Sequence, residues 1–83
     1  MRNSLEILDE IKIILTDNNL IAERQELDDA ILGSSTGGEL CGRSGYTLLT
    51  LQKRNEQVKN SVGHLIKEFI LFCNANNIYL NEI

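Results

Sequence analysis

The sequence predicts an all-α protein, a small antiparallel four-helix bundle that forms a single domain over residues 1–83. Apolar residues recur at helical spacing in several segments, and the chain contains no proline, the residue that most often interrupts helices. Its 83 residues leave room for only one small core. The hydrophobic fraction of 42% and the charged fraction of 24% indicate a globular rather than a disordered chain.

The first helix is predicted over residues 4–17. A polar pair, Asn3 and Ser4, precedes Glu6, which is typical of a helix start. Five apolar residues then fall on one side at helical spacing: Ile7, Leu8, Ile11, Ile14 and Leu15. Residues 17–19 should end this helix, because asparagine tolerates the left-handed conformation that closes a helix C-terminus.

A second helix is predicted over residues 20–32. Its apolar stripe is narrow and consists of Leu20, Leu27, Ala30 and Ile31. Gly33 is a natural stop, because glycine is common just beyond helix C-termini. The short connection from the first helix predicts that these two helices form an antiparallel hairpin.

Residues 33–51 contain five of the six glycines in the chain. We expect a third helix over residues 37–54, because Thr36 and Glu39 have the spacing of a capping box. Its small residues would share one side of the helix: Gly38, Cys41, Gly42 and Gly45. Glycine inside a helix lowers its stability, so this side predicts close approach of another backbone.

The same segment also permits a β-hairpin. Its turn would lie at residues 43–45, and residues 46–52 would form a β-prone strand. An isolated hairpin is only marginally stable, and no third strand is evident in the sequence. The helix is therefore favoured over the hairpin.

The fourth helix, predicted over residues 56–76, has the strongest periodic pattern. Its apolar residues alternate in steps of four and three along one seam: Val58, Val62, Leu65, Phe69 and Phe72. The same register extends back to Leu48, so the third and fourth helices could form one rod. We place a break near Asn55, and we expect the apolar tail at residues 78–80 to fold back onto the bundle.

Several apolar residues lie off these main faces: Ile13, Ile21, Leu32, Ile70 and Leu71. They suggest a second buried surface, in a dimer or against a partner. The net charge of −4 argues against a nucleic-acid partner, because phosphate binding relies on Lys and Arg. Residues 1–40 hold nine acidic and three basic side chains, a field that would speed encounter with a basic partner.

The sequence predicts a cytoplasmic protein with no membrane association. Its first residues are too acidic for a signal peptide, and no apolar run approaches the roughly 20 residues needed to cross a bilayer. In that compartment Cys41 and Cys73 are expected to be reduced.

Patterns that could support catalysis or ligand binding are weak. Residues 37–44 resemble a phosphate-binding loop, but Arg43 replaces its lysine and no strand precedes it. Cys41, His64 and Cys73 lack the paired spacing of a zinc site and the third member of a catalytic triad. We therefore expect no enzyme activity, no metal and no cofactor.

Residues 24–28, Arg-Gln-Glu-Leu-Asp, resemble the Ser-Gln-Glu-Leu-Asp signature of the small helical-hairpin phosphatases that act on sporulation response regulators. The leading serine is Arg24 in this chain, and residues 33–83 have no counterpart in that family. The activity of those phosphatases is therefore not transferred to this chain.

The sequence thus predicts a non-catalytic protein-interaction module. Its size, acidity and helical pattern are similar to those of small bacterial immunity-type inhibitors that neutralise a basic partner, such as a toxin domain. The predicted partner-binding residues are Glu23, Glu26 and Asp29 on the second helix, with Ser34, Ser35 and Thr36 beside it. The alternative is a self-assembling structural or regulatory protein, a homodimer that pairs through the glycine side of the third helix and the seam of the fourth.

Overall fold

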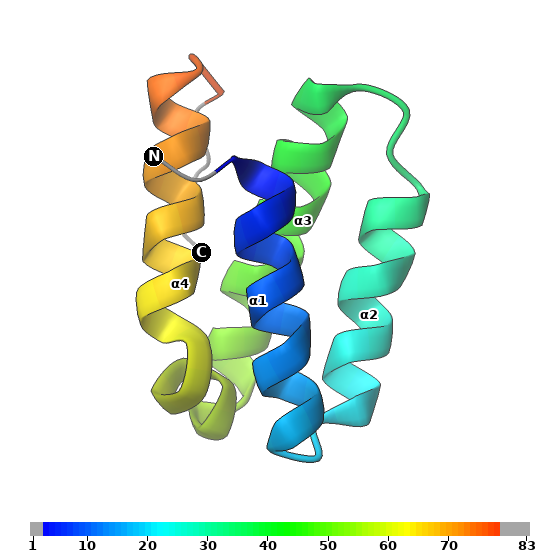
Figure 1. The fold of residues 1–83 in the computed structure, drawn as a ribbon, viewed down its shortest axis with the longest axis vertical. Helices are drawn as coiled ribbons and strands as arrows, with labels where there is room; N and C mark the ends of the chain where they lie inside the picture. The colour runs from blue at the N-terminus through cyan, green and yellow to red at the C-terminus, as the bar shows by residue number, and fades with distance from the viewer. Residues whose placement is uncertain (1–2, 79–83) are drawn as a thin grey trace.

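The computed structural model describes residues 3–78, and they form the predicted all-α bundle of four helices. The helices are α1 (Ser4–Asp17), α2 (Ile21–Leu32), α3 (Gly37–Arg54) and α4 (Glu56–Ala75). Successive helices run in opposite directions, and α4 returns to lie beside α1 (Figure 1). Each helix therefore contacts the two helices next to it in the ring: α1–α2, α2–α3, α3–α4 and α4–α1.

Side-chain caps set the starts of three helices. The Asn3 side chain accepts a hydrogen bond from the Glu6 N–H (2.9 Å), and the Glu6 carboxylate accepts one from the Asn3 N–H (3.2 Å), which completes a capping box. Thr36 caps α3 by accepting from the Glu39 N–H at 3.1 Å. The carboxylate of Glu39 accepts from the Ser35 hydroxyl instead (2.9 Å), so only half of the predicted capping box forms there.

Asn55 separates α3 from α4, which confirms the predicted break. Its backbone is extended (φ −134°, ψ 109°), and its side chain accepts a hydrogen bond from the Gln57 N–H to start α4. Asn19, at the turn between α1 and α2, has the left-handed conformation expected of asparagine (φ 59°). Residues 46–52 are helical, so the hairpin interpretation is wrong.

The apolar stripes predicted on α1 and α4 form the centre of the core. Four side chains of α1 are fully buried: Ile7, Leu8, Ile11 and Leu15. Val58, Val62, Leu65 and Phe69 of the predicted seam are also buried, while Phe72 is half-buried against the same cluster. Ile78 packs on this core, whereas residues 79 and 80 of the predicted tail lie outside the described residues.

The glycine side of α3 differs from its prediction. Among the described residues, a Cβ atom added to Gly42 would meet no heavy atom within 4 Å, and one added to Gly38 would meet only the Thr36 hydroxyl at 3.9 Å. Gly45 is buried. The prediction that Gly38 and Gly42 admit a neighbouring helix is therefore wrong within the bundle, because the core contacts of α3 run through Cys41, Leu48 and Leu51 instead.

Candidate functional site

Two of the acids predicted to bind a partner, Glu23 and Glu26 on α2, are engaged within the chain. The Glu26 carboxylate pairs with the Arg54 guanidinium at 2.7 Å, across the gap between α2 and the end of α3. Glu23 is half-buried and accepts a hydrogen bond from the Asn55 side chain at 3.3 Å. Both carboxylates therefore help to attach α2 to the junction of α3 and α4.

Asp29 is the predicted acid that stays on the surface. Its carboxylate is exposed and accepts a hydrogen bond from Gln25 at 3.0 Å, and no cation of the described residues lies within ion-pair distance of it. The three hydroxyl residues beside it have local roles. Ser34 donates to the Ala30 carbonyl, while Ser35 and Thr36 hold the first turn of α3 through Glu39.

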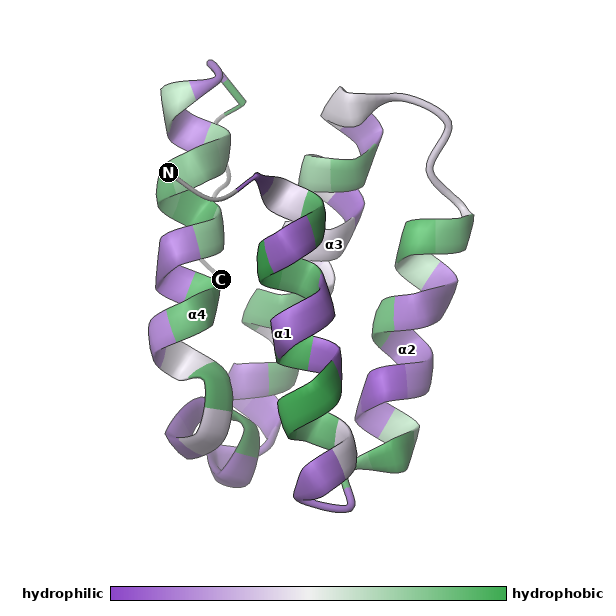
Figure 2. Cartoon of the chain, in the orientation of Figure 1, coloured by the Kyte–Doolittle hydropathy of each residue, from purple (hydrophilic) through white to green (hydrophobic). Residues whose placement is uncertain are grey.

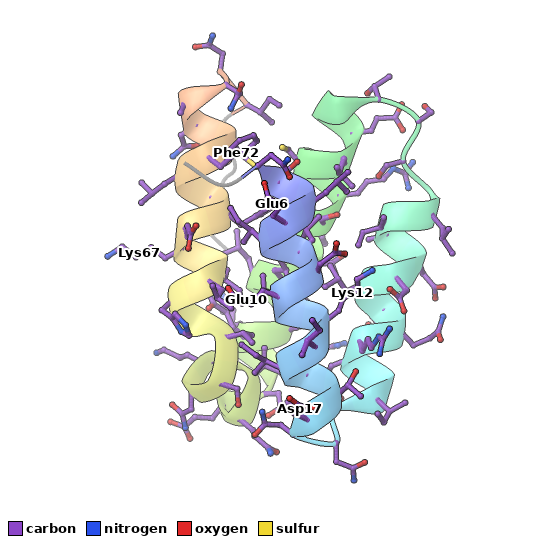
Figure 3. The ribbon with its side chains drawn as sticks, viewed as in Figure 1. Glu6, Glu10, Lys12, Asp17, Lys67 and Phe72 are labelled. Atoms are coloured by element: carbon purple, nitrogen blue, oxygen red, sulfur yellow. The ribbon has the colours of Figure 1, made fainter. Side chains whose placement is uncertain are left out.

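The basic side chains on this side of the bundle point into the α1–α2 contact. The Lys12 ammonium lies 3.5 Å from both the Asp9 and Asp28 carboxylates, and its side chain is only 23% exposed. Arg24 also binds Asp28, at 3.6 Å, and donates to the Thr16 hydroxyl at 2.6 Å. Figure 3 shows Lys12 directed from α1 towards α2. These two cations therefore neutralise acids at the interface between α1 and α2 and not acids on the outer sides of these helices.

The outer sides of α1 and α2 consequently carry exposed carboxylates and exposed apolar side chains. We call this surface the acidic face, and it consists of Asp9, Ile13, Asp17, Ile21, Asp29 and Leu32. Asp9, Ile13 and Asp17 follow one another at intervals of four, so they share one side of α1. Ile13 is 61% exposed and Leu32 is 82% exposed, which are large values for aliphatic side chains.

The sequence pattern located only part of this face. Ile13, Ile21 and Leu32 stood out because they fall off the main apolar stripes. The acids Asp9 and Asp17 carried no such signal, since solvated carboxylates are common on helices. Which acids lack a cation depends on the positions of Lys12, Arg24 and Arg54 in the fold.

Asp17 and Asp29 occupy electrostatically unfavourable positions. Each lies in the last turns of its helix, where the macrodipole favours positive charge, and neither α1 nor α2 has a basic residue in its last turn. Asp17 is exposed at the front of the lower end of α1 (Figure 3), and no described residue forms an ion pair with it. These acids therefore do not stabilise the helices that carry them.

Cys41 and Cys73 are free thiols that lie together in the core between α3 and α4. Burial raises the pKa of Cys73, and hydrogen bonding with Cys41 raises it further. The thiolate form of Cys73, the form that acts as a nucleophile or metal ligand, is therefore disfavoured. His64 is exposed, and the described residues contain no group of three or more His, Cys, Asp and Glu side chains arranged to hold a metal.

The segment that resembles a phosphate-binding loop is helical. Residues 37–44 form the first two turns of α3, and Arg43 pairs with Glu39 at 3.7 Å. Thr36 caps the N-terminus of α3 through the Glu39 N–H, so this segment is the start of a helix and not a glycine loop.

Comparisons with protein-family models, with curated proteins and with solved structures gave no significant match. None of the helices in the described part of the chain is both long enough and apolar enough to span a bilayer.

Proposed function

We propose that this chain is a non-catalytic binding module, a small acidic inhibitor of the immunity type that neutralises a basic protein partner such as a toxin domain. The acidic face carries the proposal. Among the described residues, its carboxylates at Asp17 and Asp29 form no ion pair, while Asp9 pairs with Lys12. Its aliphatic side chains are more than half exposed. A basic partner would supply both the missing cations and the cover for the apolar groups.

Charge complementarity of this kind acts mainly on association rate and specificity. Apolar anchors at the centre of an interface supply more of the affinity. Ile13 has this arrangement, because Asp9 and Asp17 lie one turn before and one turn after it on α1. We place the proposed surface on α1 and at Asp29, because Glu23 and Glu26 are already bound to Asn55 and Arg54 within the chain.

The test begins with capture of the partner from an extract of the native host by the tagged chain. Asp17→Lys and Asp29→Lys should each lower the association rate about tenfold or more at low salt, with a weaker effect at high salt. Both substitutions place a cation near a helix C-terminus, so the fold should not suffer. Addition of the wild-type chain should also abolish the activity of the captured partner.

Glu56→Lys is the control for net charge, because it makes the same change in net charge at an exposed site on α4, beside the α3–α4 junction. It places a cation in the first turn of α4, where the macrodipole favours an acid, so circular dichroism must show that this variant is folded. If Glu56→Lys and Asp29→Lys lowered the association rate equally, only net charge would matter. The acidic face would then have no special role in binding. A captured partner that is acidic, or that remains active in the complex, would contradict the proposed inhibition.

A homodimer remains the second candidate, and the open glycine side of α3 favours it. The Val58–Phe69 seam is buried within one chain. Of the two predicted pairing surfaces, the one around Gly38 and Gly42 is therefore the one that the described residues leave open to a second copy. Gly42→Leu tests this directly, because the space beside Gly42 is open within the bundle. Light scattering should show a dimer that Gly42→Leu converts to monomer, and a wild-type monomer at all concentrations would exclude this candidate.

A further inference from the structure

Cys41 on α3 and Cys73 on α4 are two thiols that the surfaces described above do not use. Both belong to the same buried core cluster, in which Cys41 is 2% exposed and Cys73 has no exposed surface. Both are free, and the Cys73 thiol has a side-chain hydrogen bond with Cys41. The fold therefore places the two sulfur atoms of the described residues against each other.

The register of the α3–α4 hairpin explains this contact. A Cβ atom added to Gly63 on α4 would lie 3.9 Å from the Gln52 side chain on α3, so these two positions face each other. The two helices run in opposite directions, and each rises about 1.5 Å per residue (Figure 1). Cys41 lies eleven residues before Gln52, at the level of the position eleven residues after Gly63, which is the neighbour of Cys73.

Both cysteines also lie near helix ends, at the same end of the bundle (Figure 1). Cys41 is in the second turn of α3, after Gly37 and Gly38, and Cys73 is in the last turn of α4. Helix ends open locally at low free energy, and glycine lowers helix stability further. A reagent should therefore reach the two thiols without unfolding of the whole bundle, although burial slows the reaction because it keeps Cys73 protonated.

We propose that Cys41 and Cys73 form a redox-sensitive crosslink between α3 and α4, made by exchange with a small disulfide such as oxidised glutathione. One cysteine thiolate attacks the small disulfide, which releases one small thiol and leaves a mixed disulfide. The other cysteine then attacks the protein sulfur of this mixed disulfide, so the Sγ–Sγ bond forms and the second small thiol leaves. The two cysteines together lose two electrons and two protons, and the small disulfide gains them.

The crosslink closes the α3–α4 hairpin at both of its ends. The chain already joins the helices at Asn55, and the disulfide joins them at the opposite end, between positions 32 residues apart. Such a bond restricts the unfolded chain more than the folded chain, so the oxidised bundle is more stable than the reduced one. The proposal does not depend on the acidic face or on the proposed inhibition.

Incubation of the folded chain with oxidised glutathione tests the proposal. Alkylation and mass spectrometry should show the loss of both thiols, and peptide mapping should find one link, between Cys41 and Cys73. The midpoint of thermal unfolding should rise by about 10 °C or more, and a reducing agent should reverse this rise. In glutathione buffers the crosslink should form at a concentration of oxidised glutathione about tenfold or more lower without urea than in urea, because folding holds the two thiols together.

Two variants are the controls, and circular dichroism must show that both are folded. Cys73→Ala should form no crosslink, and oxidised glutathione should not raise its thermal midpoint. Cys41→Ala combined with Arg43→Cys keeps two thiols but moves one about 200° around α3, to an exposed position. This double variant should crosslink no more readily without urea than in urea.

Four results would each overturn the proposal. They are two thiols that stay free, mixed disulfides or links between chains in place of the internal link, a thermal midpoint that falls on crosslinking, and a double variant that crosslinks as readily as the wild type.

Discussion

Helices α2 and α4 are held in the bundle by different kinds of contact. Helix α4 buries six side chains of its apolar stripe: Val58, Val62, Leu65, Ile66, Phe69 and Cys73. Helix α2 buries Leu27 alone, and Figure 2 shows hydrophilic colours along its middle and hydrophobic colours at its two ends. Ile31 is half-buried against the same core, and the remaining attachments are polar, chiefly Asp28 to Lys12 and Glu26 to Arg54.

This difference predicts unequal stability within one small domain. Burial of a large apolar side chain contributes about 1.5–3 kcal/mol, whereas an exposed ion pair contributes about 0–1 kcal/mol. Helix α2 should therefore open at lower free energy than α4, as a local unfolding event. It also carries Ile21, Asp29 and Leu32 of the acidic face, so the least anchored helix supplies part of the proposed contact surface.

The largest effect is expected at the centre of α4. Phe69→Ala removes a side chain with no solvent exposure and should lower the free energy of unfolding by about 3–5 kcal/mol. Because α4 contacts both α1 and α3, the loss should appear as a cooperative decrease in the stability of the whole bundle. Urea denaturation followed by circular dichroism measures it. A loss below about 1 kcal/mol would contradict the packing described for α4.

Leu27→Ala should cause the next largest loss of unfolding free energy, and this loss should be concentrated in α2. It removes the one fully buried side chain of α2 and should cost about 2–4 kcal/mol. Native-state hydrogen exchange should show that the amides of α2 lose protection, while those of α1 and α4 lose less. A uniform loss over all four helices would mean that α2 does not open separately.

A pH-dependent loss of stability is expected from the α3–α4 contact. The pKa of Cys73 in the folded protein is raised above its ordinary value of 9.0. Above about pH 9 the unfolded chain therefore loses this proton first, and stability falls as pH rises, by about 1.4 kcal/mol per pH unit for one thiol. Cys73→Ala lacks this proton, so its unfolding free energy should decrease less between pH 8 and about pH 10. If the unfolding free energies of wild type and Cys73→Ala decreased equally with pH, the Cys73 proton would not be the cause of the loss.

The smallest effect is expected at the polar attachment of α2. Lys12→Met keeps most of the aliphatic stem but removes the ammonium between Asp9 and Asp28, at a cost of about 0.5–1 kcal/mol. Sodium chloride should reduce the difference in unfolding free energy between Lys12→Met and wild type, because it screens partly exposed charges. Lys53→Met, on the exposed side of α3, is the control and should change stability little. A difference unaffected by salt would point to packing rather than charge.

Much of the helical architecture could be predicted because its signals are local. The capping pattern at Asn3 and Glu6, the apolar stripe of α1 and the seam of α4 all depend on neighbours within a few residues along the chain. The break at Asn55 was also placed correctly, although the apolar register runs through it, because asparagine caps the helix that follows.

The tertiary structure decided which polar groups remain free. Glu23 and Glu26 meet partners 32 and 28 residues away along the chain, so their periodicity on α2 could not show that they are engaged. The glycines of α3 had the spacing for close packing, yet the bundle leaves Gly38 and Gly42 beside open space. Local sequence determined where helices begin and end, whereas the acidic face and the contact between Cys41 and Cys73 exist because distant side chains meet, or fail to meet, when the helices pack.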